Sequence, residues 1–463
     1  MTTAAEESGV SYKFMLPLVL GTMMNPLNST MLATSLITLC NSFKVTAGSG
    51  ALLITSLYVT STIAQPLMGR LADLFSAKKV NMLGFVLVLI AALIGIAAPG
   101  FSWLIVSRVV LGLGTSAAYP SAMAIINRNY ASKQMPVPGK VLGVVALSGQ
   151  VSMVLGPVLG GLLTQLLGWK GIFFINIPWV IVAIYLSRAI PDFPSLQNTN
   201  KDSLYKKLDV TGVVLFSMFL LALLAFLLQH DLSLVMLGAA IVLLILMIVW
   251  EWRQGSPFID VKLLAQKPAL LLVYVRTLAT NYVLYLMLYA MPQWIEGVRH
   301  LKPAQTGLLM FPLSLMAIAV GLITSKSNKL ILQNVLGVFV LLLACTGLFM
   351  LTGHTPIYLF ILFTLVMGTA DGINLIANQA LLNAETPLNK KGVSFGLFRT
   401  FGYIGAIISS TQLKSLFGNG ITDHNFHQIG YYTFYSCIAL VILLIPLFFR
   451  KKILQADFVP EQV

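Results

Sequence analysis

Long apolar stretches alternate with short polar or Pro/Gly-containing breaks along the whole chain. Fourteen stretches are near or above the ~20 residues that a helix needs to cross a hydrocarbon core of roughly 30 Å. They cover residues 14–39, 50–70, 80–98, 102–126, 140–167, 171–190, 209–228, 232–252, 268–292, 304–325, 331–351, 356–382, 392–416 and 428–449. Because lipid offers no partner for backbone N–H and C=O groups, and the stretches are too long for barrel strands, we expect fourteen transmembrane helices.

The composition agrees with a lipid environment. Hydrophobic residues make up 57% of the 463 residues and charged residues only 10%, against about 25% charged in soluble domains. The three cysteines, Cys40, Cys345 and Cys437, lie in or near apolar stretches without paired spacing, so we expect inert thiols. The sequence predicts an all-α integral membrane protein.

Charge sets the expected orientation. The net charge is +14, and most Lys and Arg residues fall in the segments that are expected on the same side of the membrane as the N-terminus. The opposite loops hold only Lys44, Lys170, Arg299, Lys302 and Lys414. By the positive-inside bias, both termini are expected to be cytoplasmic, in a multi-pass protein of the plasma membrane. No soluble domain carries a basic stripe, so nucleic acid is not an expected partner.

A weak internal repeat divides the chain. The spacing of Gly139, Gly143 and Gly149 recurs in Gly392, Gly396 and Gly402, and Gly114-Thr115 recurs as Gly368-Thr369. Such a repeat is typical of transporters built from two helix bundles that rock about a midplane site. We expect six-helix bundles at 1–200 and 261–463, and a peripheral, lipid-facing pair of helices inserted at 201–260.

Four motifs resemble those of one family. Residues 69–79 resemble the G-x-L-A-D-x-x-G-r-k loop motif of the major facilitator superfamily, with Ser76 or Ala77 in place of the second glycine. Residues 104–114 resemble its fourth-span motif, and 149–161 resemble its fifth-span motif, which is associated with antiporters. Residues 169–178 resemble the sixth-span entry of the 14-helix drug:proton antiporter family. The resemblance implies two six-helix bundles, two inserted helices and alternating access around a midplane cavity.

The first motif has two interpretations. The resemblance implies a gating loop, in which Asp73 ties helix ends together when the cavity opens outward. The alternative is an exposed loop ion pair with Arg70, worth ~0–1 kcal/mol. The expected gating residues are Gly69, Arg70, Asp73, Lys78 and Lys79.

The fifth-span motif also has two interpretations. Its glycines would leave a strip without side chains, so that a neighbouring helix approaches closely, and Pro157 permits a bend. A packing role and a gating role both remain open, and family analogy favours gating. The residues concerned are Gly149, Gly156, Pro157, Gly160 and Gly161.

Four ionisable residues lie inside the spans, namely Arg108, Arg276, Asp371 and Arg399. Each costs at least ~2.5–3.5 kcal/mol at a helix centre unless it faces a cavity or a partner. Asp371 is the deepest carboxylate, and desolvation would let it exchange protons; a structural salt bridge to Arg399 or Arg276 is the alternative. The resemblance links Arg108 to proton movement, and a carbonyl-bonded structural role is its alternative.

The chain departs from the family in the first span. Asn28 stands where relatives carry an acid, and an amide cannot carry a proton. Asn28 hydrogen-bonds either a substrate or a neighbouring helix. Polar and aromatic residues on inward-facing spans are expected to line the cavity: Asn25, Asn28, Tyr58, Gln65, Tyr119, Gln150, Arg276, Asn281, Tyr282, Gln293, Asn374, Asn378, Arg399 and Tyr403.

The leading functional prediction is proton-coupled efflux of an amphipathic or lipophilic compound by a monomeric secondary transporter. Asp371 is the first candidate for the proton carrier, and Arg108 is the second. An importer or exchanger of an anionic metabolite is an alternative, since the arginines outnumber the acids. A non-transporting membrane receptor is a further alternative. No nucleotide loop, metal cluster or nucleophile arrangement is recognisable, so we expect neither an enzyme nor a cofactor or metal.

Overall fold

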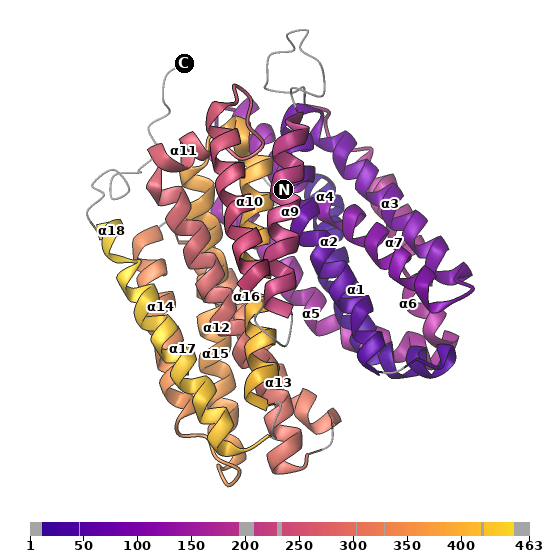
Figure 1. The fold of residues 1–463 in the computed structure, drawn as a ribbon, viewed down its shortest axis with the longest axis vertical. Helices are drawn as coiled ribbons and strands as arrows, with labels where there is room; N and C mark the ends of the chain where they lie inside the picture. The colour runs from indigo at the N-terminus through magenta and orange to yellow at the C-terminus, as the bar shows by residue number, and fades with distance from the viewer. Residues whose placement is uncertain are drawn as a thin grey trace, which may run out of the picture.

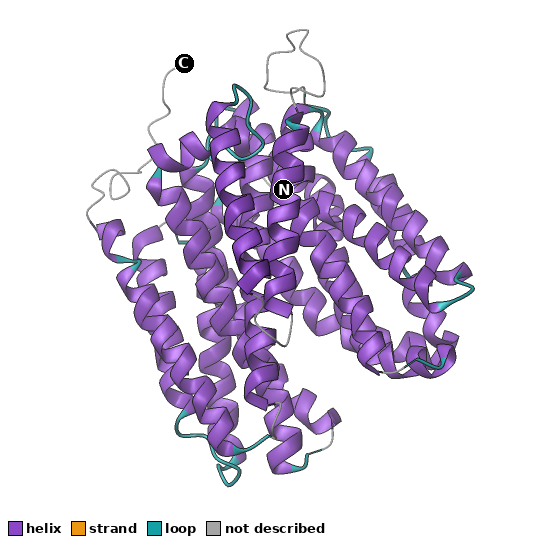
Figure 2. Cartoon of the chain, in the orientation of Figure 1, coloured by secondary structure: helices purple, strands orange, loops and turns teal. Residues whose placement is uncertain are grey.

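The computed structural model describes residues 12–45, 47–193, 208–228, 234–301, 303–327, 329–417 and 421–448. Within these ranges the regular structure is helical and no strand occurs (Figure 2). The predicted all-α class is confirmed. The expected boundary between residues 200 and 201 and the loop residue Lys302 lie outside the described residues.

The first half of the chain forms six long helical segments. They are α1 (Tyr12–Phe43), α2 (Ala47–Leu74), α3 (Ala77–Ala97), α4 (Phe101–Ser132), α5 (Gly139–Leu167) and the bent pair α6 (Gly171–Phe174) and α7 (Asn176–Ser187). The second half repeats this count with α12 (Pro268–Arg299), α13 (Pro303–Thr324), α14 (Leu330–Leu348), α15 (Ile357–Glu385), α16 (Lys391–Phe417) and α17 (Asp423–Ile442). Between the halves lie α9 (Val210–Leu228), α10 (Leu234–Arg253) and the short α11 (Val261–Gln266), and α18 (Ile445–Phe448) follows α17.

The fourteen expected spans all fall on helices, but fewer helices meet a test of length and apolarity. Nine helices of the described residues are long and apolar enough to cross a membrane. The number is ten if Leu159–Phe174 and α7, which meet at a bend of 45°, are counted as one span. Several helices carry polar residues toward their ends, as α17 does with Asp423 at its start. The chain is thus multi-pass, and the full count of fourteen spans stays a prediction.

The two halves pack by the same pattern. In the first, α1 lies against α5 while α2 and α3 lie against α4; in the second, α12 lies against α16 while α13 and α14 lie against α15. The contacts that join the halves include α2 with α16, α4 with α16 and α5 with α13. In Figure 1 the indigo and orange-yellow parts stand side by side and diverge toward the lower end.

The repeated glycines lie where the halves meet. A Cβ at Gly392 would overlap the carbonyl oxygen of Gly69 in α2, and a Cβ at Gly139 would overlap that of Ser325, directly after α13. Gly392 lies in the first turn of α16 and Gly139 in the first turn of α5, so each joint depends on a glycine at the start of a helix. The repeated glycines of the sequence therefore mark two equivalent joints, one at the start of α5 and one at the start of α16. The expected domain boundaries at residues 200 and 260 stay a prediction.

The inserted helices are peripheral. Only 22% of the apolar stretch of α9 and 17% of that of α10 is buried inside the protein. The buried side of α9 carries Phe216 and Leu220 and packs against α2 and α16. The remaining surface is apolar and exposed, as expected for helices that face lipid.

Candidate functional site

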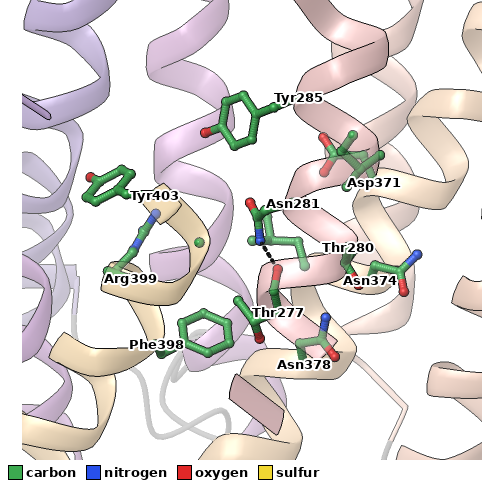
Figure 3. A pocket seen from close by; sticks show the side chains of 13 residues that line it. Thr277, Thr280, Asn281, Tyr285, Asp371, Asn374, Asn378, Phe398, Arg399 and Tyr403 are labelled. Atoms are coloured by element: carbon green, nitrogen blue, oxygen red, sulfur yellow. Dashed lines mark hydrogen bonds between the residues drawn. The ribbon is translucent and has the colours of Figure 1, made fainter. Parts of the chain in front are cut away.

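A cavity lies between the two halves and has two connected compartments. The larger, about 200 Å³, is lined by Asn25, Tyr58 and Gln150 from the first half and by Tyr285 and Asp371, among others, from the second. The smaller, about 50 Å³, is formed by α12, α15 and α16 alone. Figure 3 shows this smaller compartment, with Asp371 and Arg399 on opposite sides of Asn281. The cavity combines polar groups of both charges with aromatic and aliphatic walls.

Asp371 bridges the halves through a neutral partner. The Gln150 amide Nε2, on α5, donates to Asp371 Oδ2, on α15, at 2.8 Å. Among the described residues Asp371 forms no ion pair within 4.0 Å, so the alternative of a salt bridge to Arg399 or Arg276 is not found there. The carboxyl is half-buried and lines both compartments. The carboxyl is therefore reached from the cavity.

Arg399, on α16, forms the opposite wall. Its guanidinium carbon lies 4.0 Å from the centre of the Tyr119 ring, a cation–π contact. The Nε atom is buried and has no hydrogen-bond partner. Tyr119 itself donates to Gln379 Oε1 at 2.7 Å, which joins α4 to α15. Tyr119, which is itself fixed by this hydrogen bond, thus helps to hold the Arg399 guanidinium in place through the cation–π contact.

Tyrosines and amides join the halves beside the cavity. The Tyr403 hydroxyl donates to Asn25 Oδ1 at 3.2 Å and accepts from Gln65 Nε2 at 3.3 Å. The rings of Tyr58 and Tyr403 meet edge to face with centroids 5.6 Å apart. The interactions fix the aromatic wall that adjoins Arg399.

Asn28 and Arg108 form a separate polar cluster. Asn28 Nδ2 donates to Asn176 Oδ1 at 2.6 Å, and Asn176 Nδ2 donates back to Asn28 Oδ1 at 2.8 Å. Arg108 donates to the backbone oxygen of Asn28 at 3.4 Å and lies 5.0 Å from the centre of the Phe173 ring. Both expectations of a structural role are met in this conformation: Asn28 bonds a neighbouring helix, and Arg108 is carbonyl-bonded.

The 69–79 motif closes one end of the bundle, called here the basic end because Arg70, Lys78 and Lys391 lie there. Asp73 Oδ1 and Oδ2 accept from the backbone N–H groups of Gly392 and Val393, both at 2.9 Å, at the start of α16. A carboxylate is stabilised at a helix N-terminus by the unpaired N–H groups and the helix dipole. Asp73 is 1% exposed, so the alternative of an exposed loop pair is wrong.

Other residues of this motif hold the surrounding helix ends. The segment is helical as far as Leu74, where α2 ends, because Arg128 of α4 binds the last carbonyls, including that of Ala72 at 2.9 Å. Arg70 donates to the Ser256 oxygen at 3.2 Å, in the turn after α10. Lys78 donates to the Ile190 oxygen at 2.6 Å, whereas the Lys79 side chain is exposed. Arg128 was not predicted from the sequence.

The expected glycine strip of α5 needs correction. A Cβ at Gly156 would overlap Thr30 Oγ1 of α1, but nothing lies within 4 Å of a Cβ at Gly149 or Gly161. Gly149 faces the cavity and Gly161 is exposed, because α5 turns these positions away from α1. Of these three glycines, Gly156 is the one at which α1 approaches closely. The side chain of Pro157 lies outside the described residues.

The predicted cavity residues divide into two groups. Those that line the compartments are Asn25, Tyr58, Gln150, Asn281, Asn374, Asn378, Arg399 and Tyr403. Those that line neither compartment are Asn28, Gln65, Tyr119, Arg276, Tyr282 and Gln293. Gln293 is exposed and Arg276 is buried against Asn334, to which it donates at 2.6 Å, since each faces away from the cavity.

Sequence reasoning missed part of the α12 wall. Thr277, Thr280 and Tyr285 line the smaller compartment together with Asn281. Thr277 and Tyr285 lie one helical turn before and after Asn281, so a helical face drawn through Asn281 would have found them. Apolar Met153 and Met367, which line the larger compartment, carry no such signal.

The comparisons with known proteins identify the family. The family model described as Major Facilitator Superfamily matches residues 18–410. The chain is 31% identical over 430 residues to the uncharacterized MFS-type transporter YwoD of Bacillus subtilis, covering 90% of this chain and 92% of the relative. The chain belongs to the major facilitator superfamily, and it is a multi-pass membrane transporter and no enzyme.

Other relatives and structures are more distant. The chain is 27% identical to the multidrug efflux pump SdrM of Staphylococcus aureus, covering 88% of this chain and 90% of the pump. It is 23% identical to the riboflavin transporter RibZ of Clostridioides difficile, covering 94% and 96%. The proton:xylose symporter XylE has a similar fold, with a TM-score of 0.66 at 13% identity and coverage of 95% and 96%.

Proposed function

We propose that this transporter expels amphipathic or lipophilic compounds in exchange for protons. The carrying observation is the hydrogen bond from Gln150 to Asp371, which joins the two halves within the cavity. A charge-assisted hydrogen bond is roughly twice as strong as a neutral one, so protonation of Asp371 would weaken this link. Proton binding would then favour separation of the halves at this point.

The orientation supports export. With the basic end on the cytoplasmic side, as the positive-inside bias proposes, the closed joints at Asp73 and Gly392 face the cytoplasm. Among the described residues, the hydrogen bonds between halves lie at this end or at the cavity, as with Gln379 and the Leu142 oxygen at 2.8 Å. The cavity is therefore proposed to open outward, in a plasma-membrane monomer with cytoplasmic termini. Protons would enter from that side.

The relatives support the substrate class without defining it. SdrM is named a multidrug efflux pump and RibZ a riboflavin transporter, so related chains differ in substrate. The larger compartment mixes methionines and leucines with tyrosine and amide groups. Met side chains adapt to ligands of different shape. An apolar body with a polar group would fit these walls.

The test is proton-driven transport by Asp371→Asn in liposomes that carry an imposed pH gradient. We expect loss of uphill transport and of the accompanying change in internal pH, while binding and exchange of an uncharged substrate remain, because asparagine keeps the shape but carries no proton. Gln293→Ala is the matched control, since Gln293 is exposed and outside the cavity lining. Uphill transport retained by Asp371→Asn would exclude Asp371 as the coupling group, and Arg108→Gln would then be measured.

The second candidate function is import or exchange of an anionic metabolite. It is favoured by Arg399, which lines the cavity and whose buried Nε has no hydrogen-bond partner. It is weakened by Arg276, which is bonded to Asn334 away from the lining. In the same liposomes this function predicts flux confined to anionic compounds. A receptor without flux is the remaining alternative, and the transporter relatives count against it.

A further inference from the structure

The smaller compartment of the cavity has unused hydrogen-bonding capacity. Three buried polar atoms of residues in its lining have no partner: Thr280 Oγ1, Asn378 Oδ1 and Arg399 Nε; a fourth, Asn374 Oδ1, lies against Gly337 of α14. The side chains of Thr280 and Asn378 are at most 3% exposed. A buried polar atom left unpaired costs about 1–3 kcal/mol, so a cluster of three indicates a place for a bound polar group.

The unpaired atoms differ in kind and belong to different walls. The amide oxygen of Asn378 only accepts hydrogen bonds, and together with the Asp371 carboxyl it gives α15 a wall of acceptors, whereas the Thr280 hydroxyl on α12 both donates and accepts. Arg399, on α16, is a donor only. The first wall fits an N–H-bearing cation, and the second fits a carboxylate.

The two charges do not neutralise each other directly. Among the described residues, Asp371 and Arg399 form no ion pair within 4.0 Å. Figure 3 shows them on opposite sides of the compartment, with Asn281 between. Seven residues, these three among them, line both compartments, so a ligand that reaches the charges extends into the larger one. There Met153, Leu288 and other apolar side chains meet it.

We propose that the cavity binds amphipathic zwitterions. A protonated primary or secondary amine donates to Asp371 and to the acceptors beside it, a carboxylate binds Arg399, and the apolar body occupies the larger compartment. A quaternary ammonium group has no N–H to donate, so it forms none of the hydrogen bonds that these acceptors offer. The inference rests on the proposed function, because it names the substrate class of the same cavity.

Four probes with one naphthyl body separate the contributions of the two charges. They are N-(1-naphthylmethyl)-4-aminobutanoate as the zwitterion, N-(1-naphthylmethyl)butylamine as the secondary amine, its N,N-dimethyl quaternary derivative, and 6-(1-naphthyl)hexanoate as the anion. Binding to the purified full-length protein is measured by calorimetry. We expect the zwitterion to bind at least about tenfold more tightly than the amine or the anion, and the quaternary compound more weakly than the amine.

Variants assign each preference to a wall. Arg399→Gln should remove the advantage of the zwitterion over the amine, and Asp371→Asn should remove its advantage over the anion. Gln293→Ala should leave all four affinities unchanged. Thermal unfolding of each variant checks that it is folded, and the order of affinities in the unaltered protein decides the question if a variant is not.

A zwitterion that binds no more tightly than either singly charged probe overturns the inference. Equal affinities of the amine and the quaternary compound contradict the role of the N–H donors. Because calorimetry measures binding without flux, the zwitterion preference stands if proton coupling fails in liposomes, and proton coupling stands if the preference fails. The two proposals are therefore tested separately.

Discussion

At the scale of single residues, the protein replaces an expected acid by a closed pair of amides. Asn28 and Asn176 satisfy each other in both directions, at 2.6 and 2.8 Å, and both are buried. Arg108 donates to the backbone oxygen of Asn28 and lies over the Phe173 ring. This cluster holds no group that loses a proton at ordinary pH, so the coupling carboxyl that we propose lies elsewhere, at Asp371.

The amide pair predicts a measurable coupling energy. Asn28→Ala leaves the Asn176 amide with only its backbone partners, and it should lower the free energy of unfolding by about 1–3 kcal/mol. Asn176→Ala should do the same, whereas the double variant should lose less than the sum of the two. Thermal unfolding in detergent measures all three, and a strictly additive double variant would contradict the pair. Transport by Asn28→Ala should keep its substrate affinity.

The sequence was sufficient to find the charged centre of the site and insufficient to find its partners. Asp371 and Arg399 are recognisable because ionisable side chains inside apolar spans need a cavity or a partner. The Gln150–Asp371 bond joins positions 221 residues apart, and no local pattern relates them. Arg276 carried the same signal as Arg399 and pointed instead at Asn334, because charge and depth do not determine which way a helix faces.

At the scale of helices, close approach at the basic end depends on glycine. The start of α16 lies against α2 so closely that a Cβ at Gly69 or Gly392 would overlap backbone of the other helix. Asp73 binds the N–H groups that this approach brings within reach, at 2.9 Å. The joint consists of hydrogen bonds and close backbone contacts, and such a joint suits the end of a helix bundle that opens and closes during transport.

Gly392→Ala is predicted to open this joint. The added methyl group would meet the Gly69 oxygen, so α16 would move from Asp73 and the closed basic end would lose stability. We expect a transport rate at least about tenfold lower in liposomes and a larger distance between spin labels on the ends of α2 and α16. Gly161→Ala is the matched control, because a Cβ there meets nothing within 4 Å. Equal rates for both variants would mean that the joint is not part of the transport cycle.

The helices themselves were largely predictable, and their ends were not. Apolar stretches place α3 at 80–98 against Ala77–Ala97 in the structure, since lipid exposure demands continuous apolar sequence. The expected end of α2 at residue 70 was four residues short of Leu74, because Arg128 binds carbonyls of the last turn. A partner 50 residues or more away in the chain is invisible to hydropathy.

At the scale of the whole molecule, the structure represents one state of a transport cycle. The halves are joined at the basic end through Asp73 and, deeper in the bundle, through Gln379 and Thr400, whose hydroxyl donates to the Thr62 oxygen at 2.7 Å. They diverge toward the other end (Figure 1). Access to the cavity should therefore differ between the two faces of the membrane.

This asymmetry predicts which face reaches the cavity. Leu288 lines the larger compartment, whereas Ser325 is 4% exposed beside Gly139 at the closed joint. Leu288→Cys should react with a membrane-impermeant methanethiosulfonate applied to intact cells, and Ser325→Cys should not. The unaltered protein is the control, since Cys40, Cys345 and Cys437 are buried. If Leu288→Cys instead reacts only in inside-out vesicles, the cavity opens to the cytoplasm, and the proposed orientation and the route by which protons enter are both reversed.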